Sequence, residues 1–390
     1  MNQWLETIMN ERKFEIVNSS LQGLLKPDSL GMDHDVTPTV DLTDGVPQCK
    51  DLNPYVLKGD GWVPQHISRA NRSTYSFLCV YMTFVFLLSC SLNILVIVAT
   101  LKNKVLRQPL NYIIVNLAVV DLLSGFVGGF ISIAANGAGY FFWGKTMCQI
   151  EGYFVSNFGV TGLLSIAVMA FERYFVICKP FGPVRFEEKH SIFGIVITWV
   201  WSMFWNTPPL IFWDGYDTEG LGTSCAPNWF VKEKRERLFI ILYFVFCFVI
   251  PLAVIMICYG KLILTLRQIA KESSLSGGTS PEGEVTKMVV VMVTAFVFCW
   301  LPYAAFAMYN VVNPEAQIDY ALGAAPAFFA KTATIYNPLI YIGLNRQFRD
   351  CVVRMIFNGR NPWVDELVGS QVSSTGSQLT AVSSNKVAPA

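Results

Sequence analysis

The stretch YALGAAPAFFAKTATIYNPLIYIGL, residues 320–344, decides the class of fold. Apart from Lys331 it carries no charged side chain. A helix needs about 20 mainly apolar residues to cross the hydrocarbon core of a bilayer. The stretch therefore predicts a membrane-spanning helix that carries one lysine amine near its middle.

Six more apolar stretches precede it, and together they predict seven membrane spans. They cover residues 75–101, 110–135, 147–178, 191–213, 238–266 and 287–312, ahead of 320–344. Since a backbone inside lipid must satisfy its own hydrogen bonds, each span is expected to be helical. Pro251, Pro302 and Pro338 interrupt three spans and are expected to bend those helices. The predicted fold class is therefore an all-α membrane protein, a seven-transmembrane helix bundle.

Composition supports this class and excludes others. Hydrophobic residues make up 53% of the chain and charged residues 15%, below the roughly 25% that is typical of soluble domains. The formal net charge of +1 gives no indication of a nucleic-acid partner. The ten cysteines show no CxxC or histidine-rich spacing, so no metal site is expected.

The remaining sequence predicts three further segments around the bundle of residues 75–344. Residues 1–74 are polar, lack the apolar core of a signal peptide, and are expected to form a largely disordered tail. Residues 345–357 contain RQFRDCVVRMIF, whose basic and apolar faces predict a short eighth helix in the membrane interface. Residues 358–390 are expected to form a disordered tail rich in serine and threonine.

The charges of the short loops predict the orientation. One set of loops is richer in lysine and arginine and is expected to face the cytoplasm. The basic cluster within residues 232–237 lies on the opposite side and weakens this inference. The amino terminus is therefore expected outside the cell, and the eighth helix and the carboxyl-terminal tail inside.

Lys331 is the first candidate functional residue. A charged amine at that depth costs at least a few kcal/mol, and about a dozen residues separate it from Asn345, too many for its side chain to reach the interface. Such an amine can condense with an aldehyde to form a Schiff base, whose protonated form needs a nearby carboxylate. Glu151 in the third span and Glu219 in the second extracellular loop are the candidates. For Glu219 an ordinary solvated loop acid remains the alternative.

Polar residues at the other spans are also unusual. Cys148 and Cys225 both lie on the oxidising side, so a disulfide between them is permitted and would hold the loop across the bundle as a lid. Each of the remaining motifs stands on its own span: Asn93, Asp121, Glu172-Arg173-Tyr174, and Asn337-Pro338 with Tyr341. Glu282 and Glu284 precede the sixth span, where either could pair with Arg173 across helices.

Over residues 75–360 these motifs resemble the rhodopsin-like G-protein-coupled receptors. The resemblance rests on Asn93, NLAVVD with Asp121, the Cys148–Cys225 pair, ERY, Trp199, Pro251 with Tyr259, FCWLPY and NPLIY. The lysine in AKTATIYNP makes the chain similar to the opsins. WNTPPL (205–210), EGLGTSCAPNW (219–229) and GRNPW (359–363) resemble the non-visual ciliary opsins, the parapinopsins above all.

The resemblance implies a retinal site and a signalling surface. Retinal would be held on Lys331, 11-cis in the dark and all-trans after light, with Glu151 and Glu219 as counterions. The pocket would be lined by Gly159, Phe296, Trp300 and Tyr303. The G-protein switch would comprise Glu172, Arg173, Tyr174, Tyr259, Glu282, Asn337, Pro338 and Tyr341, and the polar core Asn93 and Asp121.

It also implies partners, a location and modifications. The expected partners are a heterotrimeric G protein of the Gi or transducin type, arrestin and a receptor kinase, at the plasma or photoreceptor cilium membrane. The protein would be a receptor and not an enzyme. Asn18 is the expected glycosylation site, and the serines and threonines after residue 369 the phosphorylation sites.

Three rival functions were weighed. A receptor for a diffusible amine would place an aspartate where Val155 stands and would leave Lys331 unexplained. A retinal photoisomerase of the opsin fold would not need ERY, NPLIY and the basic interfacial segment. A light-driven ion pump would need a file of acids along the third span. The chain also departs from visual rhodopsins at Val160 and Cys247, which replace a polar pair, and at Phe357 and Asn358, where palmitoylated cysteines would stand.

Overall fold

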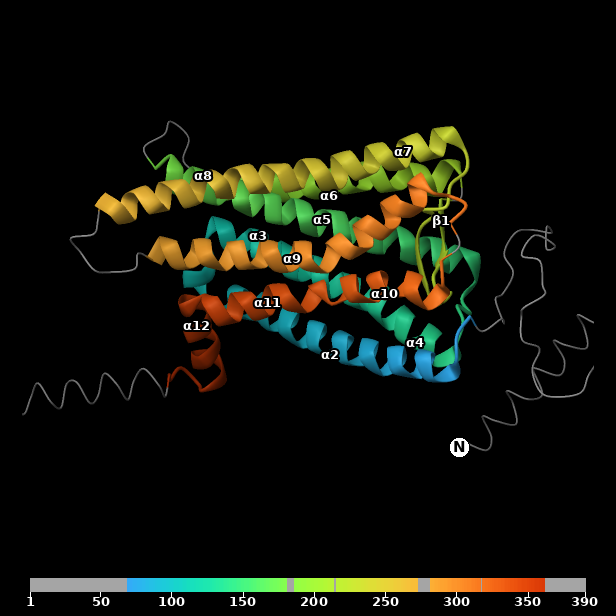
Figure 1. Ribbon diagram of the computed structural model, residues 1–390. Coiled ribbons are helices and arrows are strands. Elements are labelled where there is room, and N and C mark those ends of the chain that lie inside the picture. Colours follow the sequence, from blue (N-terminus) through green and yellow to red (C-terminus); the bar gives the residue numbers. More distant parts are fainter. Residues whose placement is uncertain (1–68, 181–185, 214, 273–280, 317, 362–390) are drawn as a thin grey trace, which may run out of the picture. The chain divides into compact units, whose positions relative to one another are not determined.

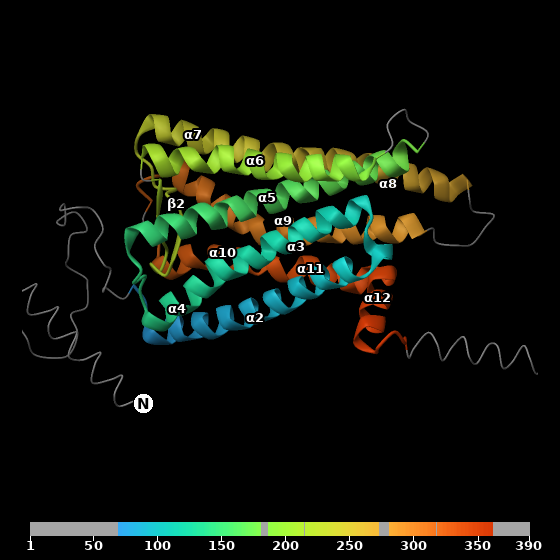
Figure 2. The same ribbon diagram turned by 180° about the vertical axis from the view of Figure 1, so that it is seen from behind.

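The computed structural model describes residues 69–180, 186–213, 215–272, 281–316 and 318–361, all within one compact unit, Tyr55–Ala390. Helices dominate these residues, and their long axes run side by side (Figures 1 and 2). In chain order the elements are α2 (Arg72–Lys102), η1 (Lys104–Leu106), α3 (Pro109–Ser124), η2 (Gly125–Phe130), α4 (Ile131–Ala138), α5 (Gly144–Cys178), α6 (Glu188–Phe212), β1 (Tyr216–Glu219), β2 (Ser224–Pro227), α7 (Lys234–Phe244), η3 (Val245–Val249), α8 (Ile250–Glu272), α9 (Pro281–Val312), α10 (Tyr320–Lys331), α11 (Ala333–Leu344) and α12 (Arg346–Ile356).

Seven helical spans are present, as the sequence predicts. The first, third, fourth and sixth are α2, α5, α6 and α9; the second is α3–η2–α4, the fifth α7–η3–α8, and the seventh α10–α11. In the described part of the chain, six helices are long and apolar enough to cross a membrane. The seventh span is not counted among them because Thr332 divides it into two helices of 12 residues each.

The prolines act in two different ways. Pro302 lies inside α9 and Pro338 inside α11, as expected for bent spans. Pro251, in contrast, is the second residue of α8 and directly follows the π-helical segment η3. A second π-helical segment, η2, interrupts the second span. Such segments change which side chains face the bundle interior, and the sequence analysis predicted neither.

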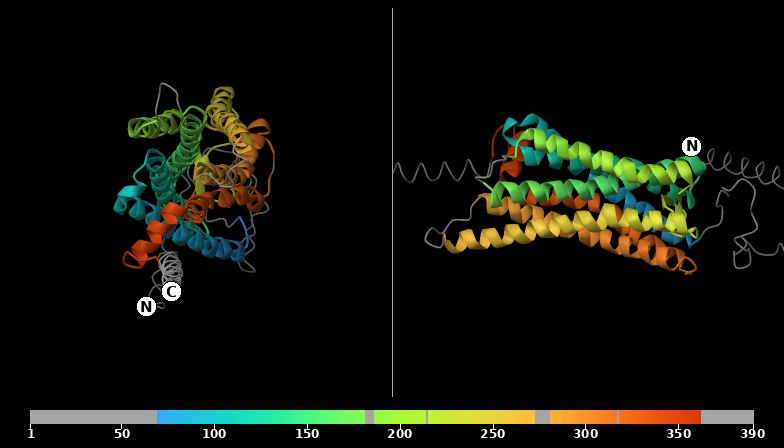
Figure 3. Two further views of the ribbon diagram at one scale, coloured as in Figure 1. Left: turned by 90° about the vertical axis from the view of Figure 1, so that its left-hand side faces the viewer. Right: turned by 90° about the horizontal axis from the view of Figure 1, so that it is seen from above.

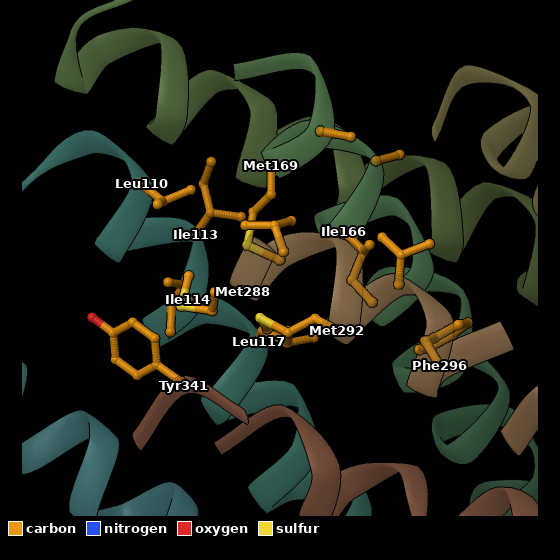
Figure 4. Packing of buried hydrophobic residues seen from close by; sticks show 14 of the residues in the cluster. Leu110, Ile113, Ile114, Leu117, Ile166, Met169, Met288, Met292, Phe296 and Tyr341 are labelled. Atoms are coloured by element: carbon orange, nitrogen blue, oxygen red, sulfur yellow. The ribbon is translucent and has the colours of Figure 1, made fainter. Parts of the chain in front are cut away.

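The core lies where the second, third, sixth and seventh spans meet. The side chains of α3 (Leu110, Ile113, Ile114, Leu117) pack with those of α5 (Ile166, Met169), α9 (Met288, Met292, Phe296) and α11 (Tyr341) (Figure 4). The third span, α5, is the most enclosed, with 61% of its most apolar window buried, against 22% for α6. The exposed faces of the other spans are apolar, which fits a lipid surroundings and not water.

Two small elements lie at opposite ends of the bundle. Strands β1 and β2 form an antiparallel hairpin between α6 and α7, with Glu219 paired to Ser224. Helix α12 runs across the other end (Figures 1 and 3). It buries Phe348 and Val352 and exposes Arg346 and Arg349, so it has the amphipathic character predicted for an interfacial eighth helix.

Candidate functional site

Lys331 is the last residue of α10, at the break in the seventh span. Its Nζ donates a hydrogen bond to Ser132 Oγ at 2.6 Å and lies 3.7 Å from Glu151 Oε1. The side chains of Lys331 and Glu151 are 12% and 0% exposed. The amine therefore has a carboxylate and a hydroxyl as partners inside the bundle, and does not extend toward either end.

Glu151 lies in the third span, near the start of α5. Its Oε2 accepts a hydrogen bond from the backbone N–H of Cys225 at 3.2 Å. Its Oε1 has no hydrogen-bond partner among the described residues and faces the Lys331 ammonium. An uncompensated buried charge is costly, so each member of this pair stabilises the other in its ionised form.

Glu219, at the end of β1, also faces the interior. Its Oε2 accepts a hydrogen bond from the Tyr303 hydroxyl at 2.9 Å, and its Oε1 from Ser224 Oγ at 3.3 Å. Trp229 Nε1 in turn donates to the Tyr303 oxygen at 3.1 Å. Burial raises the pKa of Glu219, while the Lys331 charge and the two hydroxyl donors act in the opposite direction. The loop acid is thus held inside the protein, and the alternative of a solvated side chain is wrong.

A cavity lies between the third, fifth, sixth and seventh spans, beneath the hairpin. Its space is about 950 Å³, part of it continuous with solvent, and its lining includes all four predicted pocket residues, Gly159, Phe296, Trp300 and Tyr303. Lys331 and Glu219 also line it. Glu151 is not part of the lining, so it contacts the Lys331 amine from outside the cavity.

Gly159 shows how closely the cavity wall is packed. A Cβ atom at this position would lie 2.8 Å from Trp300 Cη2, closer than two carbons can approach. The Trp300 ring therefore needs glycine opposite it in the third span. Trp300 also stacks on Phe296, with ring centroids 5.8 Å apart. The third span and the aromatic face of α9 thus fit together at this level.

The disulfide between Cys148 and Cys225 is present, with the two Cα atoms 5.4 Å apart. It joins the start of α5 to β2. Because the Cys225 N–H also binds Glu151, the disulfide fixes the hairpin beside the Lys331–Glu151 pair.

The cytoplasmic motifs form several contacts between spans. Asn337 Nδ2 donates to Asp121 Oδ2 at 3.0 Å, and Tyr341 donates to Asn111 Oδ1 at 3.0 Å. Asn93 Nδ2 donates to the Thr334 carbonyl at 3.0 Å. These bonds hold the second half of the seventh span, with Pro338 inside it, against the first and second spans.

Arg173 forms an ion pair with its neighbour Glu172, which is buried. The Tyr174 ring lies beneath the Lys261 ammonium, 5.6 Å from the ring centroid. The Tyr259 hydroxyl is buried without a hydrogen-bond partner among the described residues. The Glu282 side chain lies outside the described residues, so a pair between Arg173 and Glu282 stays a prediction.

Some residues of the site were not predicted from the sequence. Ser132 and Trp229 contact Lys331 and Tyr303, respectively, yet neither belongs to a motif. Ser132 lies just after η2, whose π-helical turn carries no sequence signal that we recognised. Asn18 and the serine- and threonine-rich tail lie outside the described residues.

Comparison with known proteins identifies the class. Residues 92–341 match the family described as "7 transmembrane receptor (rhodopsin family)". The fold is similar to that of squid rhodopsin, with a TM-score of 0.70 at 24% identity over 80% of this chain and 92% of that one. The chain is therefore a multi-pass membrane protein of the rhodopsin family of seven-transmembrane receptors.

Its relatives narrow the assignment. The chain is 45% identical to pinopsin of Columba livia over 300 residues, which are 77% of this chain and 86% of that protein. It is 44% identical to parapinopsin of Ictalurus punctatus over 327 residues, 83% and 93% of the two chains. The chain belongs to the opsins, and the similarity to non-visual opsins expected from the sequence is confirmed.

Proposed function

We propose that the protein is a light-sensing receptor that holds retinal as a Schiff base on Lys331 and couples light absorption to a heterotrimeric G protein. The observation that carries the proposal is Lys331 itself. It is a buried amine that lines an apolar cavity and has a carboxylate 3.7 Å away. Membership of the opsins supports the same ligand.

The residues of the cavity fit retinal. Most of its lining is aliphatic or aromatic, as an apolar polyene requires, and its volume lies within the range of small-ligand pockets, roughly 300–1,000 Å³. Lys331 supplies the amine for the aldehyde end, while Gly159 and Trp300 would border the chain of the ligand. When bound, retinal supplies the absorption of light and the change of shape from 11-cis to all-trans.

The protein's own groups would then perform three tasks. Glu151 neutralises the positive charge at Lys331, and Glu219 places a second carboxyl group near it. The hairpin that the Cys148–Cys225 disulfide holds excludes water from this charge. Trp300, packed against Gly159, would transmit a change in the shape of the cavity to α9.

Signalling would use the opposite end of the bundle. We infer that breaking the Arg173–Glu172 pair allows α9 to swing about Pro302 and opens a groove for a helix of a Gi- or transducin-type G protein. A receptor kinase and arrestin would act on the serine- and threonine-rich tail, since added phosphate charge costs no packing in such a segment. The amino terminus would face outward, and the protein would reside in the plasma or photoreceptor cilium membrane.

Two measurements on the purified protein test the proposal. Protein incubated with 11-cis retinal should show a visible absorption band that changes on illumination. Illumination should also stimulate nucleotide exchange on an added Gi protein. A light-dependent band with turnover of retinal isomers, but with no nucleotide exchange, would instead support the retinal photoisomerase.

Neutralising Glu172 is expected to activate the receptor without light. Glu172→Gln removes the carboxylate that pairs with Arg173, so the inactive arrangement loses a charged contact. We expect light-independent nucleotide exchange on the Gi protein to rise several-fold. Glu187→Gln is the matched control, because Glu187 pairs with Lys189 on the exposed surface and should leave the basal rate unchanged. Equal basal rates in Glu172→Gln and the unmodified protein would contradict this role.

A further inference from the structure

The turn of the β1–β2 hairpin is held by residues from several parts of the bundle. Its residues, 219–223, each contact a different partner. Glu219 binds Tyr303, Gly220 binds Arg69, Leu221 binds Tyr75, Gly222 binds Phe141 and Thr223 binds Asn136. The turn is therefore tied to the first, second, sixth and seventh spans or to the segments next to them.

Arg69 stands out among these partners because it is the one cationic contact and lies before the first span. Its Nη1 donates a hydrogen bond to the Gly220 carbonyl at 2.7 Å. Its guanidinium lies 4.9 Å from the centroid of the Tyr320 ring, at the start of α10. Its backbone N–H donates to the Tyr75 oxygen at 3.0 Å, and the Tyr75 hydroxyl donates to the Leu221 carbonyl at 3.2 Å. Arg69 thus connects the chain before α2, the turn and the seventh span.

The turn fits tightly against the seventh span at the same point. Gly220 has a φ of +49°, and a Cβ atom there would lie 2.8 Å from Ala324 Cα. Leu221 is buried in a cluster with Tyr75 and Phe328. The turn reaches these contacts only while its backbone stays in place, and the Gly220 carbonyl is the group that Arg69 holds.

Glu219 directly precedes this carbonyl. The Gly222 N–H closes the turn by donating to the Glu219 carbonyl at 2.9 Å. A shift of Gly220 would therefore move Glu219 away from the Tyr303 hydroxyl. The second half of the turn has separate anchors, since Phe141 N–H donates to the Gly222 carbonyl at 3.0 Å and Thr223 Oγ1 donates to Asn136 Oδ1 at 3.2 Å.

We propose that Arg69 is a positioning residue, a latch that keeps the hairpin turn seated over the cavity, holds Glu219 against Tyr303 and keeps water from Lys331. The shielding of Lys331 rests on the proposed function, whereas the seating of the turn rests on the contacts of Arg69 alone. No sequence motif pointed to Arg69, because its partners are a backbone carbonyl 151 residues away and an aromatic ring.

Hydrogen–deuterium exchange of the retinal-free protein tests the latch directly. In Arg69→Ala, amides of residues 219–222 should exchange about tenfold faster, which corresponds to about 1.4 kcal/mol less protection. Those of residues 225–227 should change little, because the disulfide still holds β2. Arg69→Lys keeps the charge but not the planar donor group, and should show an intermediate rate.

Arg72→Ala is the matched control. Arg72 lies three residues further along and donates to the Gly137 carbonyl at the end of α4, not to the hairpin. It should leave exchange at residues 219–222 unchanged. Equal exchange in Arg69→Ala and the unmodified protein would overturn the proposal, as would equal acceleration by Arg72→Ala. If Arg69→Ala does not fold, Arg69→Lys and Arg69→Gln decide in the same assay, and unmodified exchange in both overturns it.

A second readout concerns Lys331 in the retinal-bound protein. Hydroxylamine attacks a retinal linkage that water can reach, so dark loss of the visible band should be about tenfold faster in Arg69→Ala and unchanged in Arg72→Ala. A normal hydroxylamine rate alongside faster amide exchange would overturn the shielding of Lys331. Failure of the unmodified protein to bind retinal would refute the proposed function, while the exchange experiment would still decide the latch.

Discussion

Lys331→Met is expected to abolish the visible absorption band of protein incubated with 11-cis retinal. Among the described residues, Lys331 is the lysine that lines the cavity, so its loss leaves no amine within reach of a bound aldehyde. Lys331→Ala should have the same effect. Lys102→Met is the matched control, because Lys102 lies exposed at the end of α2, and it should form the band normally.

The loss must be separated from a loss of folding. Removing Lys331 leaves Glu151 buried without its counter-charge, which is costly. The double variant Lys331→Met with Glu151→Gln removes both charges, so it should fold better than Lys331→Met alone and should still form no band. A light-sensitive band in a folded variant without Lys331 would refute the proposed attachment site.

The bundle could be predicted from the sequence because lipid allows few alternatives. Apolar stretches of the right length must become helices, and all seven did. The helix ends differ by a few residues, since α2 begins at Arg72 and α9 at Pro281, where polar residues extend the helix beyond the apolar run. The break at Thr332 and the π-helical segments were not predicted, because they depend on how the spans pack and not on hydropathy.

The site was predictable where depth in the membrane made a residue conspicuous. Lys331 and Glu151 are charges inside apolar runs, so each needed a partner, and the structure brings them together. Ser132 and Arg69 are ordinary residues by composition. Their roles arise from contacts with residues 199 and 151 positions away, which only the folded bundle defines.

Glu219 was undecided for a different reason. A loop acid is solvated unless the loop folds inward, and sequence alone gives no conformation for a loop. The hairpin pairing of Glu219 with Ser224, the disulfide at Cys225 and the hydrogen bond from Tyr303 together place this carboxyl group at the cavity. These contacts also show that the two acids are not equivalent. Glu151 faces the amine directly, while Glu219 already accepts hydrogen bonds from two hydroxyl groups.

Glu151→Gln and Glu219→Gln should therefore affect the pigment unequally when its visible band is titrated in the dark. A nearby carboxylate favours the protonated linkage, so its removal lowers the midpoint pH at which the band is lost. We expect Glu151→Gln to lower this midpoint by about two pH units or more, since its carboxylate lies 3.7 Å from the amine nitrogen.

The dark effect of Glu219→Gln should be smaller. Burial raises the pKa of Glu219, which increases the fraction of this carboxyl group that is neutral at a given pH and reduces its influence on the linkage. After illumination the order is expected to change. A shift of the linkage away from Glu151 would leave the carboxyl group of the loop as the remaining counter-charge, so Glu219→Gln should lower the midpoint of the illuminated form.

Asp217→Asn is the control for both forms, because Asp217 lies on the same strand as Glu219 but is exposed. Its titration should match that of the unmodified protein in the dark and after light. If Glu219→Gln also matched it in both forms, Glu219 would not be a counterion. A larger dark effect for Glu219→Gln than for Glu151→Gln would reverse the assignment, even though Glu151 lies beside the amine. Two acids on separate elements, one on α5 and one on a disulfide-held loop, then give a physical basis for a photoproduct that keeps its proton, since each serves a different position of the same charge.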